Sequence, residues 1–141
     1  MKILLLNGPN LDRLGARQPE VYGTTTLADV IATLTARAHT AGATLEAFQS
    51  ADAAAIIARI AASDADAIII NPASLTHHDR ALAEALRAFA KPVVEVHISN
   101  IASREPFRRR SLIAPIATGS IVGLGVRGYE LALDALLDPA R

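Results

Sequence analysis

Short runs of consecutive apolar residues alternate along the chain with longer stretches in which apolar residues recur at the helical period. A continuous apolar run is typical of a strand that is covered on both faces. Such runs lie at residues 3–6 and 67–70, and runs of mixed character predict further strands at residues 44–49 and 93–96 and within residues 116–122. The run at residues 44–49 is more polar than the others, so we expect this strand at an edge of the sheet.

The stretches between these runs predict helices. The first begins at a sequence typical of a capping box, Thr26-Leu27-Ala28-Asp29, and Gly42 marks its end. Further helices are predicted from the same period over residues 52–62, 82–89 and 126–136. Tyr129 falls on the apolar face of the last of these helices.

Strict alternation of strand and helix predicts an α/β fold, in which a parallel sheet carries helices on both faces. Five strands within 141 residues favour a flavodoxin-like doubly wound sheet, and residues 1–141 are interpreted as one domain. In such sheets, ligands bind beyond the carboxyl ends of the strands, near the point where the strand order reverses.

Polar residues gather at the carboxyl ends of three predicted strands. These residues are Asn7, Asn10, Asn71, His97, Ser99 and Asn100. Amides, an imidazole and a hydroxyl suit a small ligand that is rich in oxygen. Alternatively, Asn and Ser cap strands and form turns, which explains any one of these residues better than all of them together.

The composition argues against several classes of binding partner and excludes cysteine chemistry. The 14 basic residues balance 14 acidic ones, so no net positive charge favours nucleic acid or an anionic membrane. The absence of cysteine excludes disulfides, thiolate nucleophiles and cysteine-based zinc sites. The apolar run at residues 1–7 is too short for a signal peptide, and no segment approaches a membrane span. We therefore expect a soluble, cytoplasmic protein with no nucleic-acid or membrane partner.

The sequence Gly123-Leu124-Gly125-Val126-Arg127-Gly128 matches the G-x-G-x-x-G pattern of dinucleotide-binding turns. It follows the last predicted strand, and no second βαβ unit comes after it to hold the other nucleotide. We interpret the motif as a tight turn with close helix packing rather than a cofactor site.

Two charged clusters have competing interpretations. His77-His78-Asp79 suggests a metal site, but adjacent helical residues point about 100° apart and no further ligand cluster accompanies them. We expect no metal here, and the single imidazole of His77 is the more useful feature. Arg108-Arg109-Arg110 is either a solvated basic face or a run from which one guanidinium turns toward an anion.

Longer motifs point to a family. In order, the chain carries Asn7-Gly8-Pro9-Asn10-Leu11, Leu14-Gly15, Arg17-x-Pro19-Glu20-x-Tyr22-Gly23, Gln49-Ser50, Asn71-Pro72 with Thr76-His77, Val94-Glu95-Val96-His97-x-Ser99-Asn100, Arg104-Glu105-x-Phe107-Arg108, Ser111, Pro115-x-Ala117-x-Gly119 and Gly123-x-Gly125-x-x-Gly128-Tyr129. This series resembles the type II 3-dehydroquinate dehydratases and covers almost the whole chain.

The resemblance implies a lyase that dehydrates 3-dehydroquinate to 3-dehydroshikimate by anti elimination through an enolate. This step belongs to the shikimate pathway toward chorismate and the aromatic amino acids, although a quinate-degrading role stays open. The resemblance also implies a flavodoxin-like subunit, a trimer as building block, a homododecamer, and no metal or organic cofactor.

The resemblance makes the irregular stretch at residues 11–25 the active-site lid, which carries Arg17 and the base Tyr22. A tyrosine with a reference pKa of about 10 is a poor base at neutral pH. Lowering that pKa by roughly three units needs about 4 kcal/mol of differential stabilisation. Arg17 and Arg108 are the cations available for this, and lid closure strengthens them by excluding water.

The remaining site residues also follow from the resemblance. Asn10 matches the residue that, with a bound water, stabilises the enolate oxygen. His97 matches the general acid for the departing hydroxyl, and Glu95 would orient it. The positions that hold the substrate's ring hydroxyls match Asn71, His77 and Arg108, and the turn that binds its carboxylate matches Ile98 and Ser99.

Some positions depart from the commoner family pattern. Glu84 stands in place of an aspartate that reaches the site of a neighbouring subunit, and by helical period it points away from the core of its own chain. Other departures are Ala51-Asp52-Ala53-Ala54, His78-Asp79 and Ala102.

The competing hypothesis is a non-enzymatic flavodoxin-like module that binds a small polyol or phosphate metabolite. This alternative explains the fold and the asparagines. It does not explain why Tyr22, Glu95 and His97 occur together with Arg17.

Overall fold

A computed structural model describes residues 1–16 and 19–138, apart from the side chains of Val21 and Tyr22. At its centre lies a five-stranded parallel sheet in the order β2-β1-β3-β4-β5. The strands are β1 (Lys2–Asn7), β2 (Thr44–Gln49), β3 (Ala67–Asn71), β4 (Val93–His97) and β5 (Gly119–Val122). The order confirms the doubly wound fold and places β2 at an edge, as predicted.

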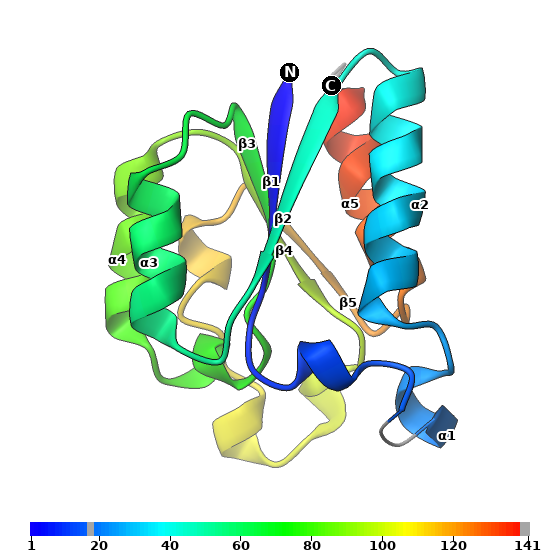
Figure 1. Cartoon of the computed structure of the whole chain (residues 1–141). Coiled ribbons are helices and arrows are strands. Elements are labelled where there is room, and N and C mark those ends of the chain that lie inside the picture. The colour runs from blue at the N-terminus through cyan, green and yellow to red at the C-terminus, as the bar shows by residue number, and fades with distance from the viewer. Residues whose placement is uncertain (17–18, 139–141) are drawn as a thin grey trace.

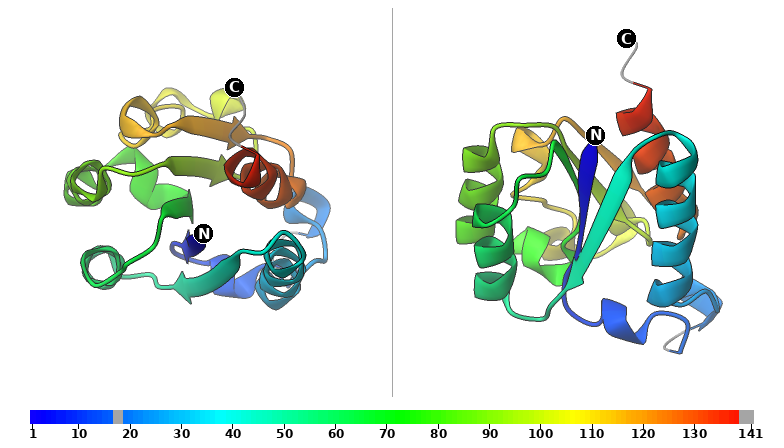
Figure 2. Two further views of the ribbon diagram at one scale, coloured as in Figure 1. Left: turned by 90° about the horizontal axis from the view of Figure 1, so that it is seen from above. Right: turned by 45° about the horizontal axis from the view of Figure 1, so that its top comes forward.

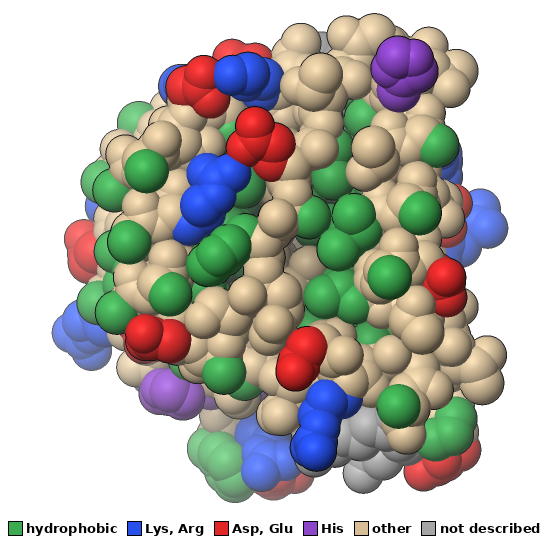
Figure 3. Space-filling model, viewed as in Figure 1, with side chains coloured by type: hydrophobic (Ala, Val, Ile, Leu, Met, Phe, Trp, Pro, Cys, Tyr) green, Lys and Arg blue, Asp and Glu red, His purple; other side chains and the backbone are tan. Residues whose placement is uncertain are grey.

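Helices cover both faces of the sheet (Figures 1 and 2). One face carries α2 (Leu27–Thr40) and α5 (Arg127–Leu137), and the other carries α3 (Ala53–Ala61) and α4 (Arg80–Phe89). Figure 3 shows apolar side chains between α3 and α2, along the edge strand β2, with charged side chains scattered around them.

The alternation of side chains along each strand divides the core into two clusters. In β1, Ile3 and Leu5 pack with α2 and α5, whereas Leu4 and Leu6 pack with α3 and α4. All four are at most 1% exposed. Burial on both faces explains why β1 and β3 appear in the sequence as continuous apolar runs.

Local hydrogen bonds fix the start of α2. The Thr26 hydroxyl accepts a hydrogen bond from the Asp29 amide at 3.1 Å, and the Asp29 carboxylate accepts one from the Thr26 amide at 3.0 Å. This reciprocal pair is the capping box expected from the sequence, and it satisfies amides that have no partner within the helix.

The stretch at residues 11–25 contains more structure than its lack of period predicts. It begins with a 3-10 turn, η1 (Leu11–Arg13), and also contains a one-turn helix, α1 (Pro19–Tyr22). Leu11 and Leu14 are buried against the cluster that includes α2, so the first part of this segment is anchored. A single turn is too short to display a helical period, which is why the sequence pattern did not show it.

The other short helices all follow β3 or β4. They are η2 (Ala73–His77), η3 (Ile101–Ser103), η4 (Pro106–Arg108) and η5 (Ala114–Ile116). The two lysines lie at the opposite, amino-terminal end of the sheet, where Lys2 Nζ is 2.5 Å from an Asp64 oxygen and Lys91 Nζ donates to the Ala65 carbonyl. Within the described residues, no helix combines the length and apolar character needed to cross a membrane.

Candidate active site

A cavity of about 350 Å³ opens at the carboxyl ends of the strands. Seven residues that the sequence predicts for the site line it. They are Asn10, Asn71, His77, His97, Ile98, Ser99 and Arg108. The cavity lies beside the point where the strand order reverses, because Asn7 and Asn71 are register partners at the ends of the neighbouring strands β1 and β3.

The remaining predicted residues lie elsewhere. Glu95 is buried beneath the cavity, and Glu84 lies on the outer side of α4 with its side chain 65% exposed. Glu84 does not line the cavity of its own chain, and its carboxylate lies 3.9 Å from Arg87 Nε. Arg17 and the side chain of Tyr22 lie outside the described residues.

Glu95 and His97 form a buried pair on β4. Because they are two positions apart on a strand, their side chains point to the same face of the sheet. Glu95 Oε2 lies 2.6 Å from His97 Nε2, and the two residues are 1% and 4% exposed. Since His97 also lines the cavity, this pair connects the protein interior to the ligand space.

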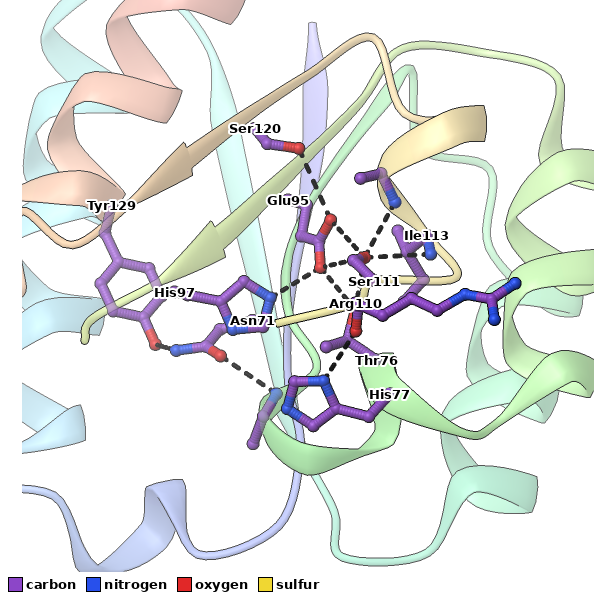
Figure 4. Close-up of polar contacts among 12 residues, drawn as sticks. Asn71, Thr76, His77, Glu95, His97, Arg110, Ser111, Ile113, Ser120 and Tyr129 are labelled. Atoms are coloured by element: carbon purple, nitrogen blue, oxygen red, sulfur yellow. Dashed lines mark hydrogen bonds and ion pairs between the residues drawn. The ribbon is translucent and has the colours of Figure 1, made fainter. Parts of the chain in front are cut away.

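Hydroxyl groups hold the Glu95 carboxylate in place (Figure 4). Thr76 Oγ1 donates to Oε2 at 2.5 Å, and Ser111 Oγ lies 2.9 Å and 2.8 Å from Oε1 and Oε2. The Ser111 oxygen also accepts hydrogen bonds from the backbone amides of Ile113 and Ala114. Its single proton is therefore left to donate, and the acceptors within reach are the Glu95 oxygens and Thr76 Oγ1, which lies 2.7 Å away.

These donors determine the charge of Glu95. Burial by itself raises the pKa of the carboxyl group, but hydrogen bonds from His97, Thr76 and Ser111 outweigh burial and leave the pKa below its ordinary value. Glu95 is consequently an ionised acceptor, so His97 Nε2 carries the proton that it shares with Glu95. His97 Nδ1 is then the ring nitrogen that this pair leaves for a ligand.

A second polar cluster occupies the opposite face of the sheet, beneath α5. Asn71 Nδ2 donates to the hydroxyl of Tyr129 at 2.9 Å, and that hydroxyl donates to Asn7 Oδ1 at 2.7 Å. The sequence pattern placed Tyr129 only on the apolar face of α5. Its phenol could have indicated this polar cluster, because a buried tyrosine hydroxyl ordinarily has a polar partner.

His77 is fixed by a backbone carbonyl. Its Nδ1 lies 2.7 Å from the Arg110 carbonyl oxygen, which can only accept, so Nδ1 is the donor. A neutral His77 therefore carries no proton on Nε2. This nitrogen can accept a hydrogen bond from a ligand hydroxyl.

Arginine residues supply positive charge at the cavity. Arg13, Arg104 and Arg108 line it. Arg108 is half exposed, with its Nε 3.0 Å from a Glu105 oxygen and its guanidinium 5.2 Å from the centre of the Phe107 ring. Of the run at residues 108–110, only Arg108 lines the cavity.

Asn10 lines the cavity from a left-handed backbone conformation, with φ of 69° at the start of η1. Asparagine tolerates this conformation better than most residues. Among the described residues, no group of three or more His, Cys, Asp or Glu side chains is placed to hold a metal ion.

The G-x-G-x-x-G motif is a turn that brings α5 close to the sheet. Gly123 has φ of 87°, and a Cβ there would lie 3.0 Å from Asn100 Cβ. A Cβ on Gly128 would lie 3.2 Å from Val96 Cγ1. These contacts confirm the prediction of a tight turn with close helix packing.

Comparison with known proteins gives a consistent result. The family described as dehydroquinase class II matches residues 1–137. The 3-dehydroquinate dehydratase of Roseiflexus castenholzii is 53% identical over 97% of this chain and 88% of its own length. The catabolic 3-dehydroquinase of Aspergillus clavatus is 49% identical over 94% of this chain and 89% of its own length. The crystal structure of type II dehydroquinase from Propionibacterium acnes matches with a TM-score of 0.91 and 46% identity, covering 96% of this chain and 95% of that one.

Proposed function

The chain belongs to the class II dehydroquinase family, and on this basis we propose that it dehydrates 3-dehydroquinate to 3-dehydroshikimate by anti elimination through an enolate. The observation that carries the proposal is the buried Glu95–His97 pair beneath the cavity at the carboxyl ends of the strands. A non-enzymatic binding module has no need for such a pair, because holding a polyol requires no proton donor.

The cavity suits a substrate that combines a carboxylate with several hydroxyls. The turn at Ile98 and Ser99 offers backbone N–H groups and a hydroxyl to the carboxylate, and the arginines favour an anion. Asn71 and His77 are assigned to the ring hydroxyls. His77 Nε2 serves as an acceptor, because its Nδ1 proton is engaged by the Arg110 carbonyl.

The first chemical step removes a proton from the carbon next to the ketone. We assign Tyr22 as the base and Arg17 as the cation that lowers the pKa of its phenol. These assignments come from the family motif, because both groups lie outside the described part of the chain. Arg108, which lines the cavity, is the other cation assigned to this task.

Removal of this proton places negative charge on the ketone oxygen. Asn10 is assigned to stabilise this enolate oxygen, together with a water molecule. A side-chain amide can donate a hydrogen bond to the oxygen without losing a proton of its own. Its position at the cavity, on the segment that precedes the lid, supports this role.

The second step breaks the bond between carbon and the leaving hydroxyl. As the enolate re-forms the ketone, the electron pair moves into the new carbon–carbon double bond, and His97 protonates the hydroxyl so that water departs. The proton comes from Nδ1 because Nε2 is held by Glu95. Ionised Glu95 stabilises the positive charge of the imidazolium before the transfer. Return of the proton from Tyr22 to His97 through solvent completes the cycle.

The proposal includes an assembly built on trimers, with a dodecamer as the complete form. Glu84 would then contact the site of an adjacent chain. Its exposed position on α4, away from the cavity of its own chain, supports this assignment.

The activity is tested by mixing purified protein with 3-dehydroquinate and following the ultraviolet absorbance of the conjugated enone product. We expect a continuous rise in absorbance with wild-type protein and at least a hundredfold slower rise with the His97→Ala variant. Binding of 3-dehydroquinate without any absorbance change would contradict the enzymatic function and favour a binding module.

A further inference from the structure

We propose that Tyr129 is a positioning residue for substrate binding, because its hydroxyl fixes the orientation of the Asn71 amide at the cavity. The inference rests on the proposed function, since Asn71 matters to the reaction only if the cavity binds 3-dehydroquinate. Tyr129 itself does not line the cavity, so it acts through Asn71.

The direction of each hydrogen bond in this cluster follows from one backbone amide. The Ala73 N–H can only donate, and it lies 3.1 Å from Asn71 Oδ1. The other end of the Asn71 amide is therefore Nδ2, which donates to Tyr129. Because the phenol oxygen accepts this bond, its own proton goes to Asn7 Oδ1 (Figure 4 shows Tyr129 and Asn71).

Because all three side chains are buried, water cannot easily take the place of the Tyr129 hydroxyl as a hydrogen-bond partner. Asn7 and Tyr129 are 0% exposed and Asn71 is 3% exposed. Burial also raises the pKa of the Tyr129 phenol well above its ordinary value, so the hydroxyl keeps its proton throughout the working pH range. A neutral phenol is the form that both accepts from Asn71 and donates to Asn7.

The fixed amide leaves a defined pair of groups for a ligand. One Nδ2 hydrogen of Asn71 is used by Tyr129, and one Oδ1 lone pair is used by Ala73. The second hydrogen and the second lone pair remain, which lets Asn71 both donate to and accept from a ring hydroxyl. Without the phenol, only the Ala73 contact orients the amide, and Nδ2 loses the acceptor that directs it.

The glycine-rich turn explains how the phenol reaches this position. Tyr129 directly follows Gly128, where a Cβ would lie 3.2 Å from Val96 Cγ1 and 3.4 Å from Ile121 Cγ2. A side chain at residue 128 would push the start of α5 away from the sheet and carry the hydroxyl with it. The motif that resembles a dinucleotide turn thus serves to place Tyr129 over the ends of β1 and β3.

The test compares Tyr129→Phe with wild-type protein on 3-dehydroquinate and on two analogues, each lacking one of the ring hydroxyls that survive the reaction. Asn71 binds the hydroxyl in both the ground state and the transition state, so its misplacement raises KM and leaves kcat nearly unchanged. We expect KM for 3-dehydroquinate to rise about tenfold, the effect of one lost hydrogen bond. For the analogue that lacks the hydroxyl bound by Asn71, the same variant should raise KM less than twofold.

Three controls separate positioning from loss of stability. Leu133→Ala creates a cavity under the same helix without removing a hydrogen-bonding group, and it should destabilise the protein while leaving KM unchanged for all three ligands. On an Asn71→Ala background, Tyr129→Phe should add no further increase in KM. Should Tyr129→Phe fail to fold, Gly128→Ala retains the hydroxyl but displaces it, and we expect a smaller rise in KM with the same dependence on the ligand.

An equal rise in KM for the substrate and both analogues would overturn the positioning role, as would an unchanged KM for the substrate. Additive effects of Tyr129→Phe and Asn71→Ala would overturn it as well. If wild-type protein does not turn over 3-dehydroquinate at all, the proposed function fails, and this outcome is recognised before any variant is measured.

Discussion

Glu95 Oε2 lies 2.6 Å from His97 Nε2 in a site that excludes almost all solvent. The carboxylate is held by Thr76 and Ser111, so it cannot rotate away from the imidazole. This relationship fixes which ring nitrogen faces the ligand and keeps a negative charge beside the ring. Both effects favour an imidazole that carries a proton to the substrate.

Replacing Glu95 with Gln tests the charge of this pair. The amide keeps the shape of the side chain but offers one acceptor instead of two charged oxygens. The N–H groups of this amide would also face the donors of Thr76, Ser111 and His97, which already point to the carboxylate. We expect kcat to fall about tenfold to a hundredfold, because hydrogen bonds to a charged group contribute about 1.5–3 kcal/mol. Steady-state kinetics measure this, and Glu46→Gln, which removes an exposed carboxylate on β2, should have no effect.

The lowered pKa of Glu95 also predicts how stability depends on pH. The folded-state pKa of Glu95 lies below the ordinary value of 4.5. The contribution of this carboxylate to the free energy of unfolding is therefore complete above pH 4.5 and is lost as the pH falls through the folded-state pKa. Urea unfolding at a series of pH values should show wild type losing more stability than Glu95→Gln below pH 4.5. If the difference in the free energy of unfolding between the two proteins stayed constant down to pH 3, folding would not change the pKa of Glu95.

Tyr22→Phe removes the proposed base without removing the ring. We expect the variant to fold normally by circular dichroism and to lose about a hundredfold to ten-thousandfold in kcat, the range typical of general base catalysis. Arg17→Ala should lower kcat less and shift the acidic limb of the pH–rate profile to higher pH, because the phenol loses a neighbouring cation and must still be deprotonated to act as the base. Near-normal turnover by Tyr22→Phe would show that another group removes the proton.

Glu84 tests the dependence of the site on a second chain. Sedimentation velocity at micromolar concentration should show an assembly with a mass that is a multiple of three subunits. Glu84→Ala should lower kcat/KM about tenfold without changing that assembly, because the carboxylate would be missing from the neighbouring site. A fully active monomer contradicts this account, and so does a Glu84→Ala variant with unchanged kinetics.

Much of this architecture is predictable because the inner strands β1, β3 and β4 are buried on both faces and each long helix has one apolar face. The capping box at Thr26 follows from the Thr-x-x-Asp pattern, and the edge position of β2 follows from the polar residues in this strand. The cavity residues Asn71 and His97 are predictable because parallel strands place their carboxyl ends together.

Other features depend on contacts between distant residues, which no local pattern records. Ser111 reaches Glu95 only because the segment after β4 folds back over the strand, and Tyr129 reaches Asn7 across 122 positions of sequence. The one-turn helix α1 escaped prediction because four residues contain no repeat of the helical period.

The most direct test of the account uses His97→Ala in deuterated buffer with 3-dehydroquinate. Removing the proton donor should block loss of the hydroxyl but leave the base and the enolate site in place. We predict that exchange of the proton next to the ketone, followed by nuclear magnetic resonance, stays within about tenfold of the wild-type rate of proton removal, while enone formation falls by at least a hundredfold. An equal loss of exchange and of enone formation would contradict the assignment of His97 as the general acid held by Glu95.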